Sequence, residues 1–164
     1  MTGVTARALG VAGAALADPL AAVELIADGV HVDPGLWPIL WKVLGRRLLL
    51  VSDAMPAAGL GDGTYRLGSL AVSVSDGQAR TADGSLAGST INVTDGVANL
   101  VAAGLSLPRA VAAATITPAA LLGRRDVGRI RIGARADLVV LDPAGSVQRT
   151  MIDGEWLAPP KRDD

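Results

Sequence analysis

Apolar residues near the start of the chain form two unbroken runs, separated by a segment with helix-spaced apolar positions. The run at 21–27 predicts a strand, and the aliphatic run at 47–54 predicts a second strand that is buried on both faces. Residues 34–44 carry the helical spacing, and Asp33 can cap that helix while Gly45 can end it. This strand–helix–strand order predicts two parallel strands joined by a right-handed crossover.

The pattern after residue 63 predicts a group of short strands, then three helices, then two closing strands. Short alternating segments at 64–81, separated by Gly-Ser and Asp-Gly pairs, are typical of an antiparallel meander. The three helices are expected over residues 90–103, 108–114 and 117–123. The closing strands are expected over residues 136–142 and 147–152, with a hairpin turn at Asp153–Gly154. The polar, proline-bearing tail at 158–164 is expected to be frayed.

Composition places these elements in one aliphatic α/β domain. Half of the 164 residues are hydrophobic and Phe is absent. Cys is absent too, which excludes disulfides, thiolate metal sites and a cysteine nucleophile. The net charge of −1 gives no electrostatic reason to expect a nucleic acid or an anionic membrane as partner. No apolar run approaches the roughly 20 residues that a membrane span needs.

The N-terminal stretch at 7–17 loosely resembles a signal peptide, because one arginine precedes a run of small apolar residues. Asp18-Pro19 follows at once and glycines interrupt the run, and both features are untypical of such a leader. Together with the absence of Cys, this pattern favours a cytoplasmic protein.

Two titratable residues, His31 and Asp53, follow the two predicted parallel strands. Such strands place their carboxyl ends at one edge of a sheet, where α/β proteins bind ligands. Asp53 is therefore a candidate catalytic carboxylate, with an ordinary turn cap as the alternative. His31 is the single histidine and a candidate acid–base partner, with a structural role as the alternative. One histidine without a neighbouring carboxylate cluster does not suffice for zinc or iron, and no Gly-x-Ser-x-Gly elbow is present.

Three other segments invite a ligand-binding interpretation. The glycines at 59–63 resemble a phosphate loop, but a meander follows them instead of a helix, so turns are expected there. Residues 86–90 are expected at a helix N-terminus, where free N–H groups favour a capping oxygen or an anion. Arg7 has no acidic neighbour in sequence, which suits a phosphate or carboxylate ligand, and a solvated surface arginine is the alternative.

Three segments carry a family resemblance when their order and separations are taken together. They are ELIADGVHV at 24–32, VSDA at 51–54 and GSLAGS at 84–89. In these features the chain resembles N-acetylglucosamine-6-phosphate deacetylases, which belong to the amidohydrolase superfamily. The ending GRIRIGARADLVVLD at 128–142 resembles the general carboxyl-terminal signature of that superfamily. The resemblance extends from Met1 to about Trp156.

The resemblance implies a metal-dependent (β/α)8 barrel with a small β-sandwich built from both chain ends. Residues 1–123, with the meander at about 64–81, would form the carboxyl-terminal part of the barrel, and residues 124–157 would supply strands of the sandwich. The implied reaction is hydrolysis of the acetamide of N-acetylglucosamine 6-phosphate to glucosamine 6-phosphate and acetate. The implied assembly is a homodimer.

The resemblance also implies roles for individual residues. Asp53 would be the general base and acid, which takes a proton from metal-bound water and delivers it to the departing amine. Arg7 matches a phosphate-binding arginine that reaches the site of a neighbouring subunit in the dimer. The remaining residues that match the sugar site are Asp28, Gly29, Val30, His31, Leu86, Ala87, Gly88 and Ser89.

The chain departs from the family pattern in one large respect. The family holds a divalent ion of the zinc or iron class with a glutamate and two histidines, and these ligands match positions upstream of Met1, as does the oxyanion-stabilising histidine. A barrel of this kind typically has about 250 residues. The chain is therefore expected to hold only the last barrel strands, as an internal start, a truncated gene product or an expressed fragment, and to be inactive alone.

Two other hypotheses about the function of the chain stay open. One is a non-catalytic module that folds by oligomerising through its open sheet edges. The other is an amidohydrolase with a different substrate, against which the Asp28–His31 turn and Arg7 argue.

Overall fold

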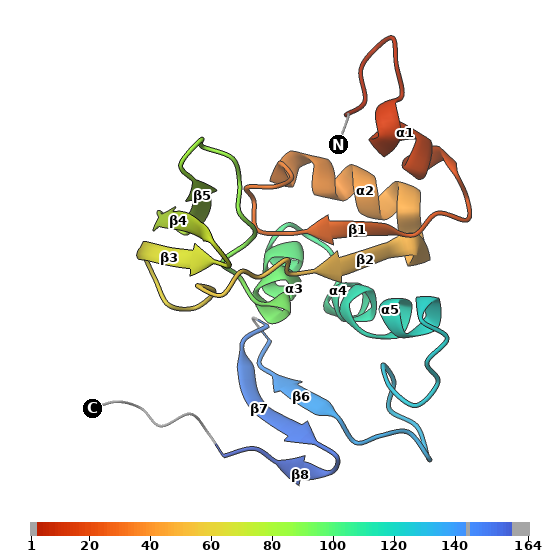
Figure 1. Ribbon diagram of the computed structural model, residues 1–164. Coiled ribbons are helices and arrows are strands. Elements are labelled where there is room, and N and C mark those ends of the chain that lie inside the picture. Colours follow the sequence, from red (N-terminus) through yellow and green to blue (C-terminus); the bar gives the residue numbers. More distant parts are fainter. Residues whose placement is uncertain (1–2, 144, 159–164) are drawn as a thin grey trace.

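Two parallel strands lie at the centre of the computed structural model, which describes residues 3–143 and 145–158 (Figure 1). Strand β1 (Val23–Ile26) pairs with β2 (Leu48–Val51), with Val23 opposite Leu48 and Ile26 opposite Val51. Both strands lie where the aliphatic runs predict them, and their parallel pairing is confirmed.

The connection between these strands begins and ends at the residues that the sequence predicts. Asp33 Oδ1 accepts a hydrogen bond from Gly35 N at 2.7 Å and caps the short 3-10 helix η1 (Pro34–Leu36), which continues into α2 (Trp37–Leu44). Gly45 ends α2 with a φ of 56°, a left-handed conformation that glycine adopts without strain. A second short 3-10 helix, η2 (Gly45–Arg47), leads into β2.

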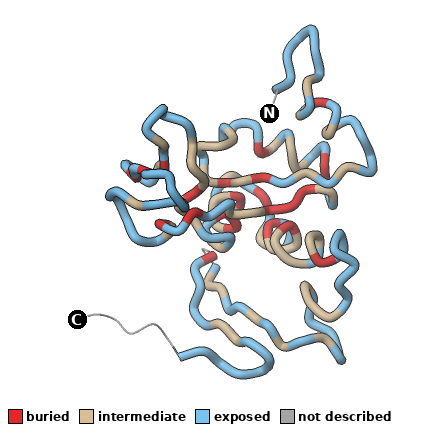
Figure 2. The backbone as a smooth tube through the Cα atoms, viewed as in Figure 1, coloured by how far each residue is buried: buried red, intermediate tan, exposed pale blue. Residues whose placement is uncertain are grey.

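Helices cover the two strands and enclose an aliphatic core. In Figure 1, α2 lies above the strands, and α3 (Val93–Ala102), α4 (Leu107–Ala114) and α5 (Ile116–Leu121) lie below them. Figure 2 shows that buried residues gather along β2 and on the inner sides of these helices. The core consists of Leu25, Ala27, Trp37, Leu44, Leu48, Leu50, Val97, Leu100, Leu105, Ala110 and Ala113.

The N-terminal helix α1 (Gly10–Ala17) is held against the strands by Arg47. The Arg47 guanidinium donates hydrogen bonds of 2.7–3.3 Å to the carbonyls of Ala15, Leu16, Asp18 and Ala21. Carbonyls at a helix C-terminus have no partner within the helix, and a cation is favourable there. Within the described parts of the chain, no helix is long and apolar enough to cross a membrane.

The predicted antiparallel meander is confirmed, and it has a small core of its own. It consists of β3 (Gly63–Leu67), β4 (Leu70–Ser75) and β5 (Gln78–Thr81), paired in chain order. Alternate residues of β4 point inward, as expected for a sheet with one solvated face. The core consists of Met55, Ala57, Val72, Val74 and Ala79.

The carboxyl-terminal strands form a third, separate sheet, in which β6 (Leu138–Leu141), β7 (Val147–Ile152) and β8 (Glu155–Trp156) pair antiparallel. The predicted hairpin turn is confirmed, because Asp153 and Gly154 adopt left-handed φ values of 50° and 85°. The Arg149 guanidinium lies 3.9 Å from the centroid of the Trp156 ring. Apart from Ala158, the predicted frayed tail lies outside the described residues.

Candidate functional site

The carboxyl ends of β1 and β2 bring two of the predicted site segments to one edge of the sheet. The last register pair is Ile26 with Val51, so Asp28 and Asp53 each follow two residues beyond it. Both strands end toward the meander, on the left of Figure 1. The segments that carry His31 and Asp53 therefore share an edge, as the sequence predicts.

Asp53 has a left-handed backbone conformation at the end of β2, with a φ of 49°. Asp76 and Asp153 share this conformation in hairpin turns, whereas Asp53 has it at a strand end. The Asp53 side chain is exposed and makes no hydrogen bond or ion pair with the residues that the structure describes. The amide of Ala54 donates to Ser52 Oγ at 3.4 Å instead. The turn-cap interpretation of Asp53 is therefore wrong, and its carboxylate is open to solvent.

One carboxylate organises the Asp28–His31 turn. Asp28 Oδ1 accepts hydrogen bonds from Val30 N and His31 N, each at 2.9 Å. Asp28 Oδ2 lies 2.7 Å from His31 Nδ1, and the two side chains are 7% and 18% exposed. Gly29 completes the turn with a φ of 79°, which suits a residue without a side chain. Asp28 thus fixes both the backbone of the turn and the ring of the histidine.

The environment of Asp28 favours its ionised form. Burial raises the pKa of this carboxyl, but hydrogen bonds from the backbone N–H groups of His31 and Val30, together with the His31 ring, outweigh that effect. The pKa of Asp28 consequently lies below the ordinary value for an aspartate. Asp28 is therefore a carboxylate at neutral pH, which can only accept hydrogen bonds.

The segment at 86–89 lies directly against the end of β2. Ser89 N donates to Asp53 O at 2.8 Å, and Met55 N donates to Ser89 O at 2.9 Å. Gly88 makes this approach feasible, because a Cβ atom at that position would lie 2.9 Å from Asp53 O. Ser89 is buried, and Ala87 packs against the core of the meander. The main chain of this segment thereby holds Asp53 in place.

The prediction that residues 86–90 lie at a helix N-terminus is wrong. Helix α3 begins at Val93, and Asn92 with Asp95 forms a capping box at its start. Asn92 N donates to Asp95 Oδ2 at 2.8 Å, so the Asn-x-x-Asp spacing marks the start of the helix. Leu86 instead forms an antiparallel bridge with Arg80, beside the meander.

Arg7 lies apart from the other predicted site residues within this chain. Its segment precedes α1 at the top of Figure 1, whereas β1 and β2 end at the left. The Arg7 side chain is exposed and has no hydrogen-bond or ion-pair partner in the described ranges. Met1, which ends the matched family motif, lies outside the described residues.

One residue that positions the site was not foreseen from the sequence. Asn99 Nδ2, on α3, donates to Ala27 O at 2.8 Å, immediately before the Asp28–His31 turn. Ala27 is fully buried, so its carbonyl would otherwise lack a partner. The sequence feature that could indicate this role is a polar residue, Asn99, directly before the buried Leu100 on the inner face of a helix.

The donors at this site do not fit a bound metal ion. Across residues 3–143 and 145–158, no three His, Cys, Asp or Glu side chains lie close enough together to hold one. The chain has a single histidine, whereas zinc and iron sites in proteins usually take three or more His or carboxylate ligands. No chemical step is therefore assigned to a metal in this chain.

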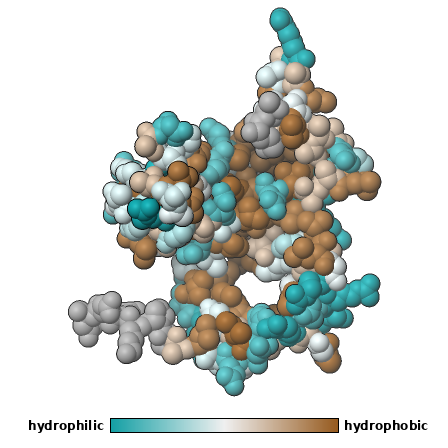
Figure 3. Space-filling model, in the orientation of Figure 1, coloured by the Kyte–Doolittle hydropathy of each residue, from teal (hydrophilic) through white to brown (hydrophobic). Residues whose placement is uncertain are grey.

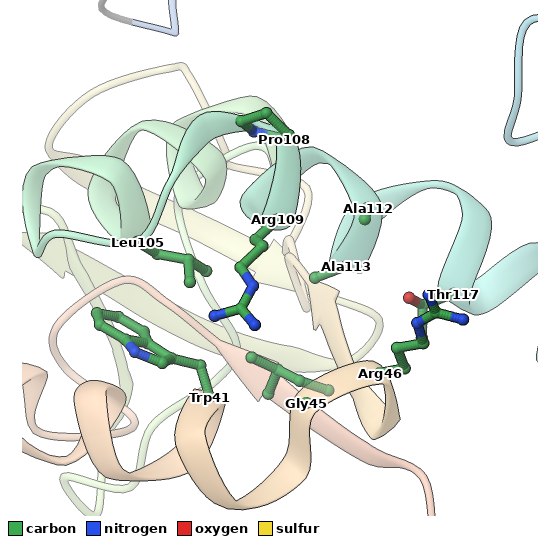
Figure 4. Close-up of a pocket in the computed structure, with 10 residues that line it drawn as sticks. Trp41, Gly45, Arg46, Leu105, Pro108, Arg109, Ala112, Ala113 and Thr117 are labelled. Carbon is green, nitrogen blue, oxygen red and sulfur yellow. The ribbon is translucent and has the colours of Figure 1, made fainter.

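Two hollows lie elsewhere in the molecule. A cavity of about 320 Å³ is lined by Gly45, Arg46 and Leu48 at the amino end of β2 and by residues of α4 such as Arg109 (Figure 4). A groove of about 770 Å³ separates α3, α4 and α5 from β6. Neither includes Asp28, His31 or Asp53 in its lining.

Comparison with known proteins relates the chain to enzymes of one type. The model of a family described as the amidohydrolase family matches residues 7–157. A protein of Escherichia coli strain K12, provisionally named an N-acetylgalactosamine-6-phosphate deacetylase, is 41% identical over 157 residues. That match covers 94% of this chain and 94% of the relative.

Longer relatives match over part of their length. The N-acetylglucosamine-6-phosphate deacetylase of Vibrio furnissii is 38% identical over 160 residues, which are 96% of this chain and 40% of that enzyme. The solved structure of a mutant N-acetyl-D-glucosamine-6-phosphate deacetylase from Mycobacterium smegmatis, in complex with N-acetyl-D-glucosamine-6-phosphate, superposes with a TM-score of 0.88 at 41% identity. It is matched over 95% of this chain and 42% of its own. The chain thus spans about two fifths of these enzymes.

Proposed function

The chain belongs to the amidohydrolase family, and we propose that it forms the sugar-binding and proton-transferring part of an N-acetylhexosamine-6-phosphate deacetylase. Its relatives are named for N-acetylglucosamine 6-phosphate or N-acetylgalactosamine 6-phosphate. The proposed reaction is hydrolysis of the acetamide, which yields acetate and the free amino sugar phosphate. One observation carries the proposal: the Asp53 carboxylate has no partner among the described residues and stands at the same strand edge as the Asp28–His31 turn.

Asp53 is suited to transfer a proton, because its carboxylate is exposed and its backbone is held by the hydrogen bond from Ser89 N. In the proposed step, water adds to the acetamide carbonyl carbon while its proton passes to the Asp53 carboxylate. The same proton then goes to the amine nitrogen as the C–N bond breaks. The amine departs, the carboxylate is regenerated, and the acetic acid formed ionises to acetate.

The neighbouring segments supply the contacts to the substrate in this proposal. The Asp28–His31 turn meets the sugar phosphate from β1, and residues 86–89 line the other side next to Asp53. Arg7 binds the phosphate in the site of a second copy, within a homodimer. Its exposed guanidinium, which has no hydrogen-bond or ion-pair partner among the described residues, supports a role in another subunit.

We assign β1, α2 and β2, with the helices that follow, to the last units of a (β/α)8 barrel. Residues 1–123 then form the barrel part, including the meander, and residues 124–157 contribute β6, β7 and β8 to a β-sandwich. The parallel pairing of β1 with β2 supports the assignment, because two parallel strands joined through a helix are the repeating unit of such a barrel.

The 164-residue chain alone is proposed to be inactive as a deacetylase. Its described residues do not form a metal site, and the chain has one histidine. Among the described residues, no cationic side chain forms an ion pair or hydrogen bond with the Asp53 carboxylate.

Release of acetate from N-acetylglucosamine 6-phosphate tests this proposal when the chain is assayed with added divalent metal. We expect no turnover above background for the wild type or for Asp53→Asn. Turnover that Asp53→Asn abolishes and Asp33→Asn retains would show that the chain is a complete enzyme. Asp33 is a matched control, because it is an exposed carboxylate that caps η1.

A second candidate function, a non-catalytic module that oligomerises, is favoured by the surface of the chain. Its accessible area is 10775 Å², whereas a compact monomer of this mass exposes about 7,600 Å². Figure 3 shows apolar side chains on the surface over the central strands and over β7. Exposed apolar residues of the third sheet include Val139, Val140, Val147, Ile152 and Trp156.

A further inference from the structure

We propose that Asp28 is a positioning residue that fixes the proton of His31 on Nδ1 and leaves Nε2 as the atom that meets the ligand. The inference rests on the proposed function, since it specifies how the Asp28–His31 turn serves the sugar phosphate. Two observations carry it: Asp28 Oδ2 and His31 Nδ1 are 2.7 Å apart, and both side chains are partly buried.

The contact between Asp28 Oδ2 and His31 Nδ1 needs a proton, and that proton must be on Nδ1, because an ionised carboxylate oxygen can only accept. A neutral imidazole carries its proton on either ring nitrogen, and the partner of one nitrogen decides which form is present. Asp28 is ionised and its other oxygen, Oδ1, already accepts two backbone N–H groups. Oδ2 can likewise only accept, so at 2.7 Å the donor of this hydrogen bond is Nδ1–H.

The second ring nitrogen is available to a ligand. His31 Nε2 has no hydrogen-bond partner among the described residues. No buried side-chain nitrogen or oxygen in those ranges lacks a partner, so Nε2 is in contact with solvent. In the neutral ring Nε2 accepts a hydrogen bond from a sugar hydroxyl, and in the protonated ring it donates to a phosphate oxygen. Asp28 holds Nδ1–H in both states.

The chain is suited to a direct measurement, because it contains one histidine. Labelling histidine with ¹⁵N gives one pair of ring-nitrogen signals, and their chemical shifts and couplings report which nitrogen carries the proton. Asp28→Asn is the informative variant, because its amide oxygen still accepts from Val30 N and His31 N while its NH₂ group can only donate toward Nδ1. Asp33→Asn makes the same chemical change in the cap of η1 and serves as the control.

We expect the neutral ring to carry its proton on Nδ1 in the wild type and in Asp33→Asn, and on Nε2 in Asp28→Asn. Dispersed amide signals confirm that each chain is folded. A folded wild type with the proton on Nε2, or an Asp28→Asn spectrum identical to the wild type, would overturn the positioning role.

Titration with glucosamine 6-phosphate completes the test. Addition of the ligand should shift the Nε2 signal of the wild type, and the dissociation constant should rise at least tenfold in Asp28→Asn but not in Asp33→Asn. Equal affinities of wild type and Asp28→Asn would overturn the link between Asp28 and the ligand. Absence of binding by all three chains would contradict the proposed function and the ligand-facing role of Nε2, while the tautomer result would still decide the positioning role.

Discussion

Main-chain contacts hold the candidate catalytic residue. Asp53 O accepts from Ser89 N at 2.8 Å, and the left-handed turn at Asp53 directs the chain out of β2. Gly88 lies so close to this carbonyl that a Cβ atom there would be 2.9 Å away. At the scale of single residues, the position of the Asp53 carboxylate therefore depends on a glycine that carries no chemistry of its own.

The close approach at Gly88 gives a prediction about stability. Gly88→Ala forces a Cβ against Asp53 O and places alanine at a φ of 100°. Gly84→Ala imposes similar backbone strain at a φ of 84° but meets no atom within 4 Å. Alanine in a left-handed conformation costs about 1–2 kcal/mol. Gly84→Ala should therefore lower the free energy of unfolding by about that amount, and Gly88→Ala should lower it by clearly more. Urea unfolding followed by circular dichroism measures both, and equal losses would contradict the contact.

The ionised state of Asp28 gives a prediction about acid stability. The pKa of Asp28 is lower in the folded chain than in an unfolded chain, where it is about 3.9. Below that pH the unfolded state binds the proton more readily, so this part of the stability is present above about pH 4 and is lost as pH falls through the folded pKa. Asp28→Asn should remove this part.

Unfolding free energies of wild type and Asp28→Asn at several pH values between 7 and 2.5 provide the measurement. The difference between the two chains should be constant above about pH 5 and should shrink on acidification, because an aspartate titrates around 3.9. Parallel pH profiles would mean that Asp28 keeps an ordinary pKa in the folded chain.

At the scale of elements, Arg47 connects β2 to α1. Its guanidinium donates to four carbonyls that follow or end α1, and it stands at the last position before β2. These bonds fix a short helix that has no basic residue of its own in its last turn. The position of α1 matters for the proposed dimer, because the segment that carries Arg7 leads directly into this helix.

Removal of the Arg47 donors should loosen α1 while the central strands stay intact. Arg47→Met keeps most of the aliphatic stem but leaves part-buried carbonyls without partners, at about 1–3 kcal/mol. Amide hydrogen exchange should accelerate in residues 10–17 and change little in β1 and β2. Arg46→Met, at the exposed neighbouring position, is the control and should leave exchange in α1 unchanged. Unchanged protection of α1 in Arg47→Met would contradict this role.

The elements were largely predictable from the sequence, because local patterns define them. Periodicity and turn residues located β1, α2 and β2, and the Asp-Gly pairs located the hairpins of the meander and of the third sheet. The Asn92–Asp95 capping box starts α3 at Val93, after the start at residue 90 that the sequence pattern predicts. The Asn-x-x-Asp spacing is the local signal for this helix start.

Local patterns do not predict contacts between segments that are far apart in the sequence. Nothing local indicates that Asn99 donates to Ala27 O, because 72 residues separate them. The bond between Ser89 N and Asp53 O likewise depends on how two loops meet. The edge shared by His31 and Asp53 is predictable from strand order, whereas an i, i+3 spacing alone does not predict that His31 pairs with Asp28.

At the scale of the whole molecule, the exposed apolar surface gives a prediction about association. The accessible area of 10775 Å² exceeds by roughly 3,000 Å² the surface that a compact monomer of this mass exposes. Each of the three sheets has open edges among the described residues, and such edges pair readily with other chains. Sedimentation velocity should show concentration-dependent association at micromolar concentrations. A single monomeric species over the whole range would contradict this expectation.

We propose that the edge formed by β1, β2 and residues 86–89 binds a phosphorylated amino sugar. Isothermal titration of the 164-residue chain with glucosamine 6-phosphate tests it most directly. We expect saturable binding with one ligand per chain, at least tenfold weaker in His31→Gln and unchanged in Asp33→Asn. Glucosamine or inorganic phosphate alone should bind more weakly than glucosamine 6-phosphate. No saturable binding, or equal affinity in His31→Gln and the wild type, would contradict it.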